Sequence, residues 1–268
     1  MTNETIFTAA LVSTEVAFLL AGERMDCGSG FGREGGEWGR EKVYPNLQRL
    51  IYHDPKQLPR HIQYPKEVHM YPESDDITDY LQSDPIIDWQ SPAVRQKALE
   101  LTSSLADEVD KARCLYEWVR DTIPHSHDAD SDIVTCTASE VLQHGTGICF
   151  AKSHLLAALL RAVNIPAGFC YQVLRRDPPV DNEPVLHGFN ALYLASLGKW
   201  IRVDARGNTH GINAQFNLQK EQLAFAMDPA ADEFIYEAIF AAPVSSVVER
   251  LKMHKSRKEL WLDLPESL

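Results

Sequence analysis

The chain has 268 residues, 44% of them hydrophobic, and a formal net charge of −12 at pH 7. This length and hydrophobic content are enough for one main domain with a sizeable core. Nucleic acids and anionic membrane surfaces attract proteins with clustered Lys and Arg, so the acidic balance argues against either as the principal partner. We therefore expect no nucleic-acid and no membrane partner, and the composition leaves the oligomeric state open.

The five cysteines, at positions 27, 114, 136, 149 and 170, form an odd set without a CxxC pair. They indicate neither a disulfide framework nor a zinc ribbon, and we expect neither a metal nor a cofactor. An apolar-leaning run over residues 6–22 is interrupted by three hydroxyl residues and Glu15, and no Lys or Arg precedes it. It therefore fails as a signal peptide or membrane span, and we expect reduced thiols in the cytoplasm.

The N-terminal third differs in composition from the rest. Seven of the fourteen glycines fall between Gly22 and Gly39, and many prolines follow in residues 40–88. Such segments favour loops, turns and extended chain. We expect a partly flexible N-terminal extension over residues 1–84, a main domain over 85–242, and a C-terminal helix and tail over 243–268.

Helices are predicted from Ser91 onward. Ser91 followed by Pro92 is typical of a helix start, and the apolar spacing continues to residue 105. A second helix is expected over 107–122. Thr137 and Glu140 have the spacing of a capping box, which predicts a short helix that stops at Gly145.

The pattern changes to strands after Pro166. Residues 168–174 alternate and are rich in aromatic and β-branched side chains, and two further runs, 187–194 and 199–203, are separated by the short segment ASLG. These features predict a strand followed by a hairpin. A further strand is expected over 233–240 and an amphipathic helix over 243–254.

Cys149 begins the most apolar helix of the chain. Residues 149–163 are almost continuously apolar, which is typical of a helix buried around most of its circumference. The unpaired N–H groups and positive dipole end at a helix start favour a thiolate over a thiol. Cys149 is therefore the candidate nucleophile.

The predicted hairpin supplies two partners for this thiol. A turn centred near Ser196 brings His187 and Asp204 opposite or diagonal to one another on one face of the sheet. Thiol catalysis needs a base and a group that orients it, so Cys149, His187 and Asp204 form a candidate Cys-His-Asp triad.

Four segments together resemble the transglutaminase-like superfamily. They are Gly147-Ile148-Cys149, the helix continuation LLRAVNIPAG at 159–168, HGFNAL at 187–192, and WIRVD at 200–204. The resemblance covers a little under half of the chain, from about Ile86 to Asn208. It implies an α+β fold, a papain-like transglutaminase core in which a central buried helix packs on an antiparallel sheet.

The resemblance also implies roles. Cys149 would be the nucleophile, His187 the general base and then acid, and Asp204 the group that orients His187. Family members often have a tryptophan two residues after the histidine, whereas this chain has Phe189, so no role of that tryptophan carries over.

A tetrahedral intermediate also needs donors for its oxyanion. The backbone N–H of Cys149 is one natural donor. The side chain of Gln143 is a second candidate, with an ordinary surface glutamine as the alternative.

Two further patterns, His154 and the aspartates of residues 128–132, are expected to have no catalytic or metal-binding role. His154 lies five residues after Cys149, a poor spacing for facing it on one helix, so we expect a structural or surface role. Asp128, Asp130 and Asp132 alternate as in a calcium loop, but Ile133 replaces the expected glycine and position twelve is not glutamate. We expect a polar loop that could rim the active site.

The predicted activity is acyl transfer from an amide through a thioester. Peptidase or amidase activity is favoured, because water is abundant and transfer to an amine requires a site that excludes it. A protein-glutamine transglutaminase and a non-catalytic binding module remain alternatives. The expected partner is a peptide, protein or small amide substrate, and the sequence does not select among these.

Overall fold

The computed structural model describes residues 70–176, 182–209 and 211–268. These residues all lie in one compact unit, Pro65–Leu268. The predictions for residues 6–22 and 22–39, and for most of the proline-rich segment, lie outside the described residues. The domain boundaries placed at residues 84 and 242 remain a prediction, and segments on both sides of each contribute to the same compact unit.

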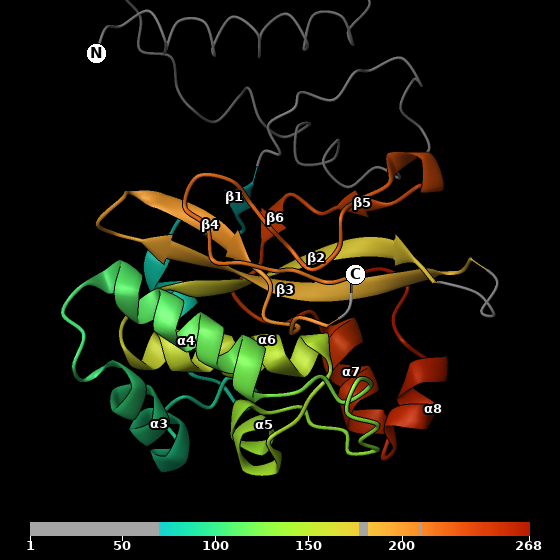
Figure 1. Cartoon of the computed structure of the whole chain (residues 1–268), viewed down its shortest axis with the longest axis horizontal. Helices are drawn as coiled ribbons and strands as arrows, with labels where there is room; N and C mark the ends of the chain where they lie inside the picture. The colour runs from blue at the N-terminus through green and yellow to red at the C-terminus, as the bar shows by residue number, and fades with distance from the viewer. Residues whose placement is uncertain (1–69, 177–181, 210) are drawn as a thin grey trace, which may run out of the picture. The chain divides into compact units, whose positions relative to one another are not determined.

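The described strands form two sheets (Figure 1). The larger has the order β4-β3-β2-β5 with antiparallel neighbours throughout, and the smaller pairs β1 with β6 in parallel. The bounds are β1 Tyr71–Pro72, β2 Ala167–Arg175, β3 Pro184–Leu194, β4 Lys199–Val203, β5 Phe234–Ile235 and β6 Ala238–Ile239. The predicted strand and hairpin are confirmed as β2, β3 and β4.

The α-helices gather on one side of the larger sheet (Figure 1). They are α3 Pro92–Thr102, α4 Glu108–Thr122, α5 Ala138–His144, α6 Cys149–Ala162, α7 Ser245–Met253 and α8 Arg257–Leu262. Two short 3-10 helices, η2 Ile77–Leu81 and η3 Pro229–Ala231, complete the described elements. The four helices predicted before Pro166 are confirmed.

Helix α6 is the centre of the packing. Every residue from Phe150 to Arg161 is buried, and the helix contacts α3, α4 and α5 as well as strands β2 and β3. Side chains on all sides of a helix are covered only when other elements surround it, as the apolar sequence predicted. The expected α+β fold, with a central buried helix packed on an antiparallel sheet, is confirmed.

Local signals in the preceding helix, α5, set the position at which α6 begins. The Thr137 hydroxyl accepts from the Glu140 N–H at 3.2 Å, and the Glu140 carboxylate accepts from the Thr137 N–H at 3.0 Å. This is the predicted capping box. Gly145 ends α5 in a left-handed conformation with φ 64°, so only a short turn leads to Cys149.

One strand prediction is wrong. Residues 233–240 form two separate two-residue strands, with β5 pairing antiparallel with β2 and β6 pairing parallel with β1. Because each strand is so short and has a different partner, no side-chain alternation distinguishes them in the sequence. Helix α7 confirms the predicted C-terminal helix, whereas α8 was not predicted.

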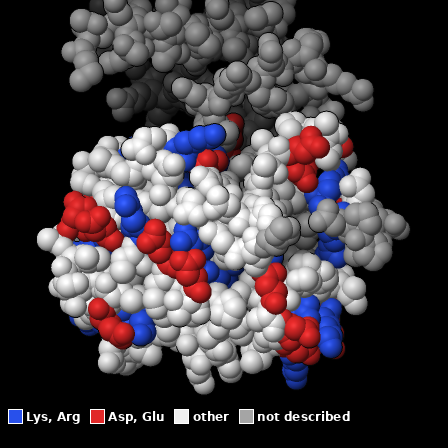
Figure 2. All heavy atoms as spheres, in the orientation of Figure 1, with Lys and Arg blue, Asp and Glu red and all other residues white. Residues whose placement is uncertain are grey.

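The described helices and the surface in Figure 2 bear on a membrane or highly charged partner. In residues 70–176, 182–209 and 211–268, none of the helices has the length and apolar content needed to span a bilayer. Acidic and basic side chains are interspersed on the face shown in Figure 2. That face therefore shows no broad field of a single charge.

The capping box gives a stability prediction. Thr137→Ala removes the hydroxyl that accepts from Glu140, so we expect the free energy of unfolding to fall by about 1 kcal/mol. Ser91→Ala is the matched control, because Ser91 precedes α3 without a side-chain cap hydrogen bond. We expect this control to stay within about 0.5 kcal/mol of the unchanged protein. Urea unfolding checks both values, and equal losses would contradict the assignment.

Candidate active site

The fold brings the three predicted residues together from three elements. Cys149 is the first residue of α6, His187 lies in β3, and Asp204 directly follows β4. Asn190 pairs with Val203, so continuing this register sets His187 diagonal to Asp204 on one face. The nitrogen Nε2 of His187 lies 2.8 Å from Oδ2 of Asp204. The diagonal arrangement expected for the hairpin is therefore present.

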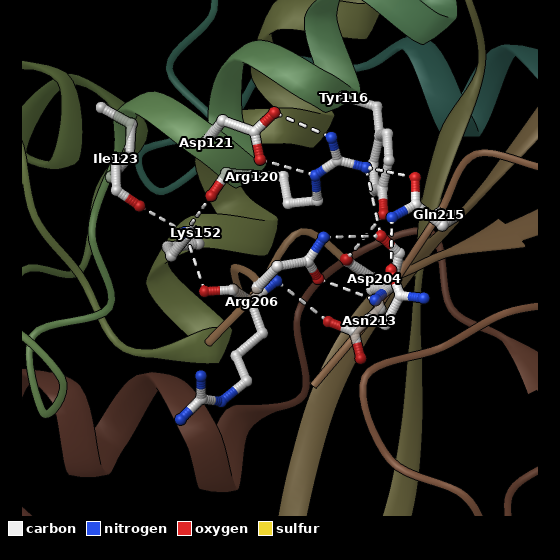
Figure 3. A network of polar contacts seen from close by, with 11 residues as sticks. Tyr116, Arg120, Asp121, Ile123, Lys152, Asp204, Arg206, Asn213 and Gln215 are labelled. Carbon is white, nitrogen blue, oxygen red and sulfur yellow. Dashed lines mark hydrogen bonds and ion pairs between the residues drawn. The ribbon is translucent and has the colours of Figure 1, made fainter. Parts of the chain in front are cut away.

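Asp204 is 1% exposed, and its carboxylate accepts three hydrogen bonds. Besides His187, the donors are the backbone N–H groups of Arg206 and Ala224, each at 3.0 Å. Burial raises the pKa of Asp204, but His187 and these hydrogen bonds outweigh burial and lower it. The Tyr116 hydroxyl donates to the Asp204 backbone carbonyl at 3.1 Å (Figure 3). The carboxylate is thus held ionised and fixed in place.

The Cys149 thiol faces the same histidine. Burial raises the pKa of Cys149, but the charge of His187, its hydrogen bond and a hydrogen bond from the Gly188 N–H together lower it. Burial likewise lowers the pKa of His187, whereas Asp204 and Cys149 raise it by a larger amount. Because Nε2 of His187 contacts Asp204, Nδ1 is the ring nitrogen left for the thiol. The arrangement favours a thiolate–imidazolium pair.

Aromatic rings surround the His187 imidazole. Phe189 lies nearly parallel to it, with ring centroids 6.1 Å apart, and Phe225 meets it edge-on at 5.0 Å. Phe189 is the residue at which the sequence departs from the family pattern. Phe225 was not predicted, because it lies in a segment without regular structure whose approach to β3 depends on the tertiary fold. The guanidinium of Arg206 lies over the Phe225 ring at 5.6 Å.

Gly188 allows β3 to approach α6 closely. A Cβ added at this position would lie 2.5 Å from the Phe150 ring, which is too close for any side chain. The N–H of the same residue helps to lower the pKa of the Cys149 thiol. Nothing in the sequence marks this N–H separately, since glycine in a strand indicates only a close approach.

The loop after α4 supports the turn that leads to Cys149. His125 forms an isolated parallel bridge with Gly147, and the Ser126 N–H donates to the Gly147 carbonyl at 3.1 Å. Burial, and next the charge of Arg206, lower the pKa of His125 well below its usual value of 6.5. The imidazole is therefore neutral at pH 7. The polar loop therefore does lie beside the candidate site.

Two acidic residues of this loop pair with arginine side chains. Asp128 accepts two hydrogen bonds from Arg206, at 2.7 and 3.0 Å, and Asp130 contacts Arg257 at 3.1 Å. The Asp132 carbonyl accepts from the Arg257 N–H at 2.9 Å. In the part of the chain that the structure describes, no group of three His, Cys, Asp or Glu side chains is arranged to hold a metal ion. The polar-loop interpretation fits these contacts.

Two further residues, Gln143 and His154, have roles predicted from the sequence. Gln143 is exposed in the last turn of α5, and its role as an oxyanion donor remains a prediction. His154 is buried, its Nδ1 lies 2.7 Å from the Cys136 carbonyl, and burial lowers its pKa to about 4. These contacts are those of the expected structural histidine.

Residues 95–205 match the family model of the transglutaminase-like superfamily. The matched interval contains Cys149, His187 and Asp204. No curated protein matches the chain.

Several solved structures are similar to the chain. One is "a Putative Cysteine Protease from Cytophaga hutchinsonii", with 21% identity over 52% of this chain and 46% of that one, and a TM-score of 0.41. The periplasmic domain of TgpA from Pseudomonas aeruginosa bound to ethylmercury has 20% identity over 47% and 46%, with a TM-score of 0.36. A TGase has 18% identity over 47% and 34%, with a TM-score of 0.32. The matched part of this chain thus covers less than half the length of each of these three proteins.

The electrostatics predict one unusually reactive thiol. Burial raises the pKa of Cys136 and Cys170 to about 11 and 12, and that of Cys114 also rises. Cys149 has a lowered pKa, so it should remain a thiolate as the pH falls below the ordinary thiol value of about 8.5. We expect iodoacetamide to label Cys149 first at pH 7, and His187→Ala to slow labelling.

Peptide mass spectrometry across pH 5–9 measures these rates. Cys114, Cys136 and Cys170 serve as internal controls in the same sample. Equal labelling of all the cysteines at pH 7 would contradict the proposed thiolate–imidazolium pair.

Proposed function

We propose that the chain is a cysteine-dependent acyl-transfer enzyme that cleaves amide bonds through a thioester, as a peptidase or amidase. The observation that carries the proposal is one buried histidine paired with a buried carboxylate, beside a thiol whose pKa it lowers. His187 lies 2.8 Å from Asp204, and the charge of His187 favours the Cys149 thiolate. This is the arrangement that nucleophilic catalysis by a thiol needs.

In the first half-reaction, the Cys149 thiolate attacks the amide carbonyl and forms a C–S bond. The C–N bond then breaks, and His187 gives its proton to the departing amine. The N–H of Cys149, at the open end of α6, is the proposed donor to the oxyanion, and Gln143 is kept as a second candidate. Asp204 keeps the imidazole oriented and stabilises its positive form.

In the second half-reaction, His187 takes a proton from water. The hydroxide formed attacks the thioester, the C–S bond breaks, and the carboxylic acid leaves with the thiolate restored. Cys149 is half-buried rather than sealed inside the core, which supports access for water. Hydrolysis is therefore favoured over transfer to an amine, which requires a site that excludes water.

A non-catalytic binding module is the alternative from a different class. The charge pair argues against it, because burying an imidazole and a carboxylate beside a thiol costs desolvation without improving packing. The proposed substrate is a peptide, protein or small amide. Four free thiols among the described residues are compatible with a reducing compartment, so a cytoplasmic location is retained as part of the proposal.

Substitution of the nucleophile tests this function. Activity-based labelling followed by a peptide-library cleavage assay should identify a cleaved amide, and Cys149→Ala should lower turnover by about 10³-fold or more. Cys114→Ala is the matched control, because this thiol lies on α4 and donates to the Leu101 carbonyl at 3.4 Å. Turnover unaffected by Cys149→Ala would mean that another residue is the nucleophile.

The same assay distinguishes the two acyl acceptors. With a primary amine added, a hydrolase should still release mainly the free acid. A product that carries the amine, formed with release of ammonia from a glutamine, would instead identify a transglutaminase.

A further inference from the structure

Lys152 is a buried lysine on the same helix as the candidate nucleophile. It lies three residues after Cys149 on α6 and is 0% exposed. Its Nζ donates to three backbone carbonyls, those of Arg120 at 3.3 Å, Arg206 at 2.8 Å, and Ile123 (Figure 3). An ammonium group has three N–H donors, so each donor has an acceptor.

Two of these carbonyls lie at the end of α4. Arg120 is in the last turn of the helix and Ile123 follows its last residue, where carbonyls lack partners inside the helix. The Arg120 carbonyl would normally bond the N–H four residues later, but that residue is Pro124, which has none. The ammonium of Lys152 thus satisfies acceptors at the negative end of the α4 dipole.

The third carbonyl connects Lys152 to the candidate triad. Arg206 accepts from Lys152 through its carbonyl and donates its own N–H to Oδ1 of Asp204 at 3.0 Å. Asp204 in turn holds His187. One residue of the loop therefore contacts both the lysine and the carboxylate.

Gly207 shows how closely this loop approaches the lysine. Its φ is 111°, a conformation that favours glycine, and a Cβ there would lie 3.2 Å from the Arg120 carbonyl oxygen and 3.3 Å from Nζ of Lys152. The loop after Asp204, the end of α4 and the start of α6 therefore meet at this ammonium group.

Burial of this cation is unfavourable by itself. Burial is the largest cause that lowers the pKa of Lys152, from 10.5 to about 7, and the nearby charges are Asp204, Arg206, Asp128 and Asp121. An apolar side chain of similar length would fill the space without this cost. The property that Lys152 adds is a set of directed donors.

Arg161 provides a matched comparison on the same helix. It is also buried, and it donates to the carbonyls of Gln82, Ala167 and Ala241. It lies near the C-terminal end of α6, whereas Cys149 begins the helix. Both cations link α6 to surrounding backbone, but only Lys152 contacts the loop that carries Asp204.

We propose that Lys152 is a positioning residue of the Cys149–His187–Asp204 triad, whose three donors hold the Asp204 loop against the helix that carries the nucleophile. The inference rests on the proposed function, because it assigns Lys152 a part in preparing the same thiol. Lys152 acts through Arg206 and Asp204 and does not touch the reacting atoms.

The test compares Lys152→Met with Arg161→Met in the full chain. The readout is the rate of Cys149 alkylation from pH 5 to 9, which needs no substrate. We expect Lys152→Met to move the profile to higher pH by about one unit, which slows alkylation about tenfold at a pH below both pKa values. Arg161→Met should leave the profile in place, although thermal unfolding should show that both variants lose stability.

The outcomes separate the two proposals. An unchanged alkylation profile in folded Lys152→Met would overturn the positioning role while leaving the proposed function intact. A wild-type profile with an ordinary thiol pKa would instead contradict the proposed function itself.

Gly207→Ala provides a second variant if Lys152→Met does not fold. The added Cβ crowds the Arg120 carbonyl and Lys152, so it should push the Asp204 loop away from the ammonium group. We expect the alkylation profile to shift in the same direction, and the low-field proton resonance of the His187–Asp204 hydrogen bond to move or broaden. A folded Gly207→Ala variant with both signals unchanged would overturn the proposal.

Stability as a function of pH tests the buried ammonium independently. Because the folded-state pKa of Lys152, about 7, lies below 10.5, the unfolded chain binds more protons between these values. Lys152 therefore makes the wild type more stable as the pH rises from 7 toward 10.5. The melting temperature of the wild type, relative to Lys152→Met, should rise across this window. A flat difference would contradict the burial of the charge on which the proposal depends.

Discussion

The burial of α6 is the constraint on which the rest of the site depends. Since every side chain from Phe150 to Arg161 is enclosed by other elements, the helix has one position and one rotation relative to the sheet. The residue at its open end is therefore fixed as well. Cys149 lies at this end, where unpaired N–H groups, His187 and Gly188 all favour the thiolate. Packing thus determines the place at which the proposed chemistry can occur.

Features that depend on near neighbours in the chain could be predicted from the sequence. The capping box of Thr137 and Glu140 needs only a spacing of three residues, and the apolar run after Cys149 indicates burial without knowledge of what covers it. The hairpin links His187 to Asp204 through a short turn, so its register sets both on one face. Fold class and the three candidate residues therefore followed from local patterns and the family resemblance.

Features that depend on distant segments could not be predicted in this way. The Ala224 N–H reaches Asp204 from a segment without regular structure, and Phe225 packs against His187 from the same segment. In the sequence, Lys152 is only a charged residue within an apolar helix. The fold shows that its ammonium group donates to three carbonyls. The two strands within 233–240 likewise depend on partners far away in the sequence. Each of these features is a property of the tertiary contacts rather than of the pattern.

The separation of His187 and Asp204 from Cys149 along the chain has a consequence for folding. Contacts between residues far apart in sequence require loop closure, whose entropy cost must be met before the contacts stabilise the structure. A nascent or partly folded chain lacks the imidazolium beside Cys149, so its sulfur has the ordinary reactivity of a thiol. An activated nucleophile would appear only once His187 and Asp204 have reached their native positions. The rate of Cys149 labelling would thereby report the formation of these contacts during folding.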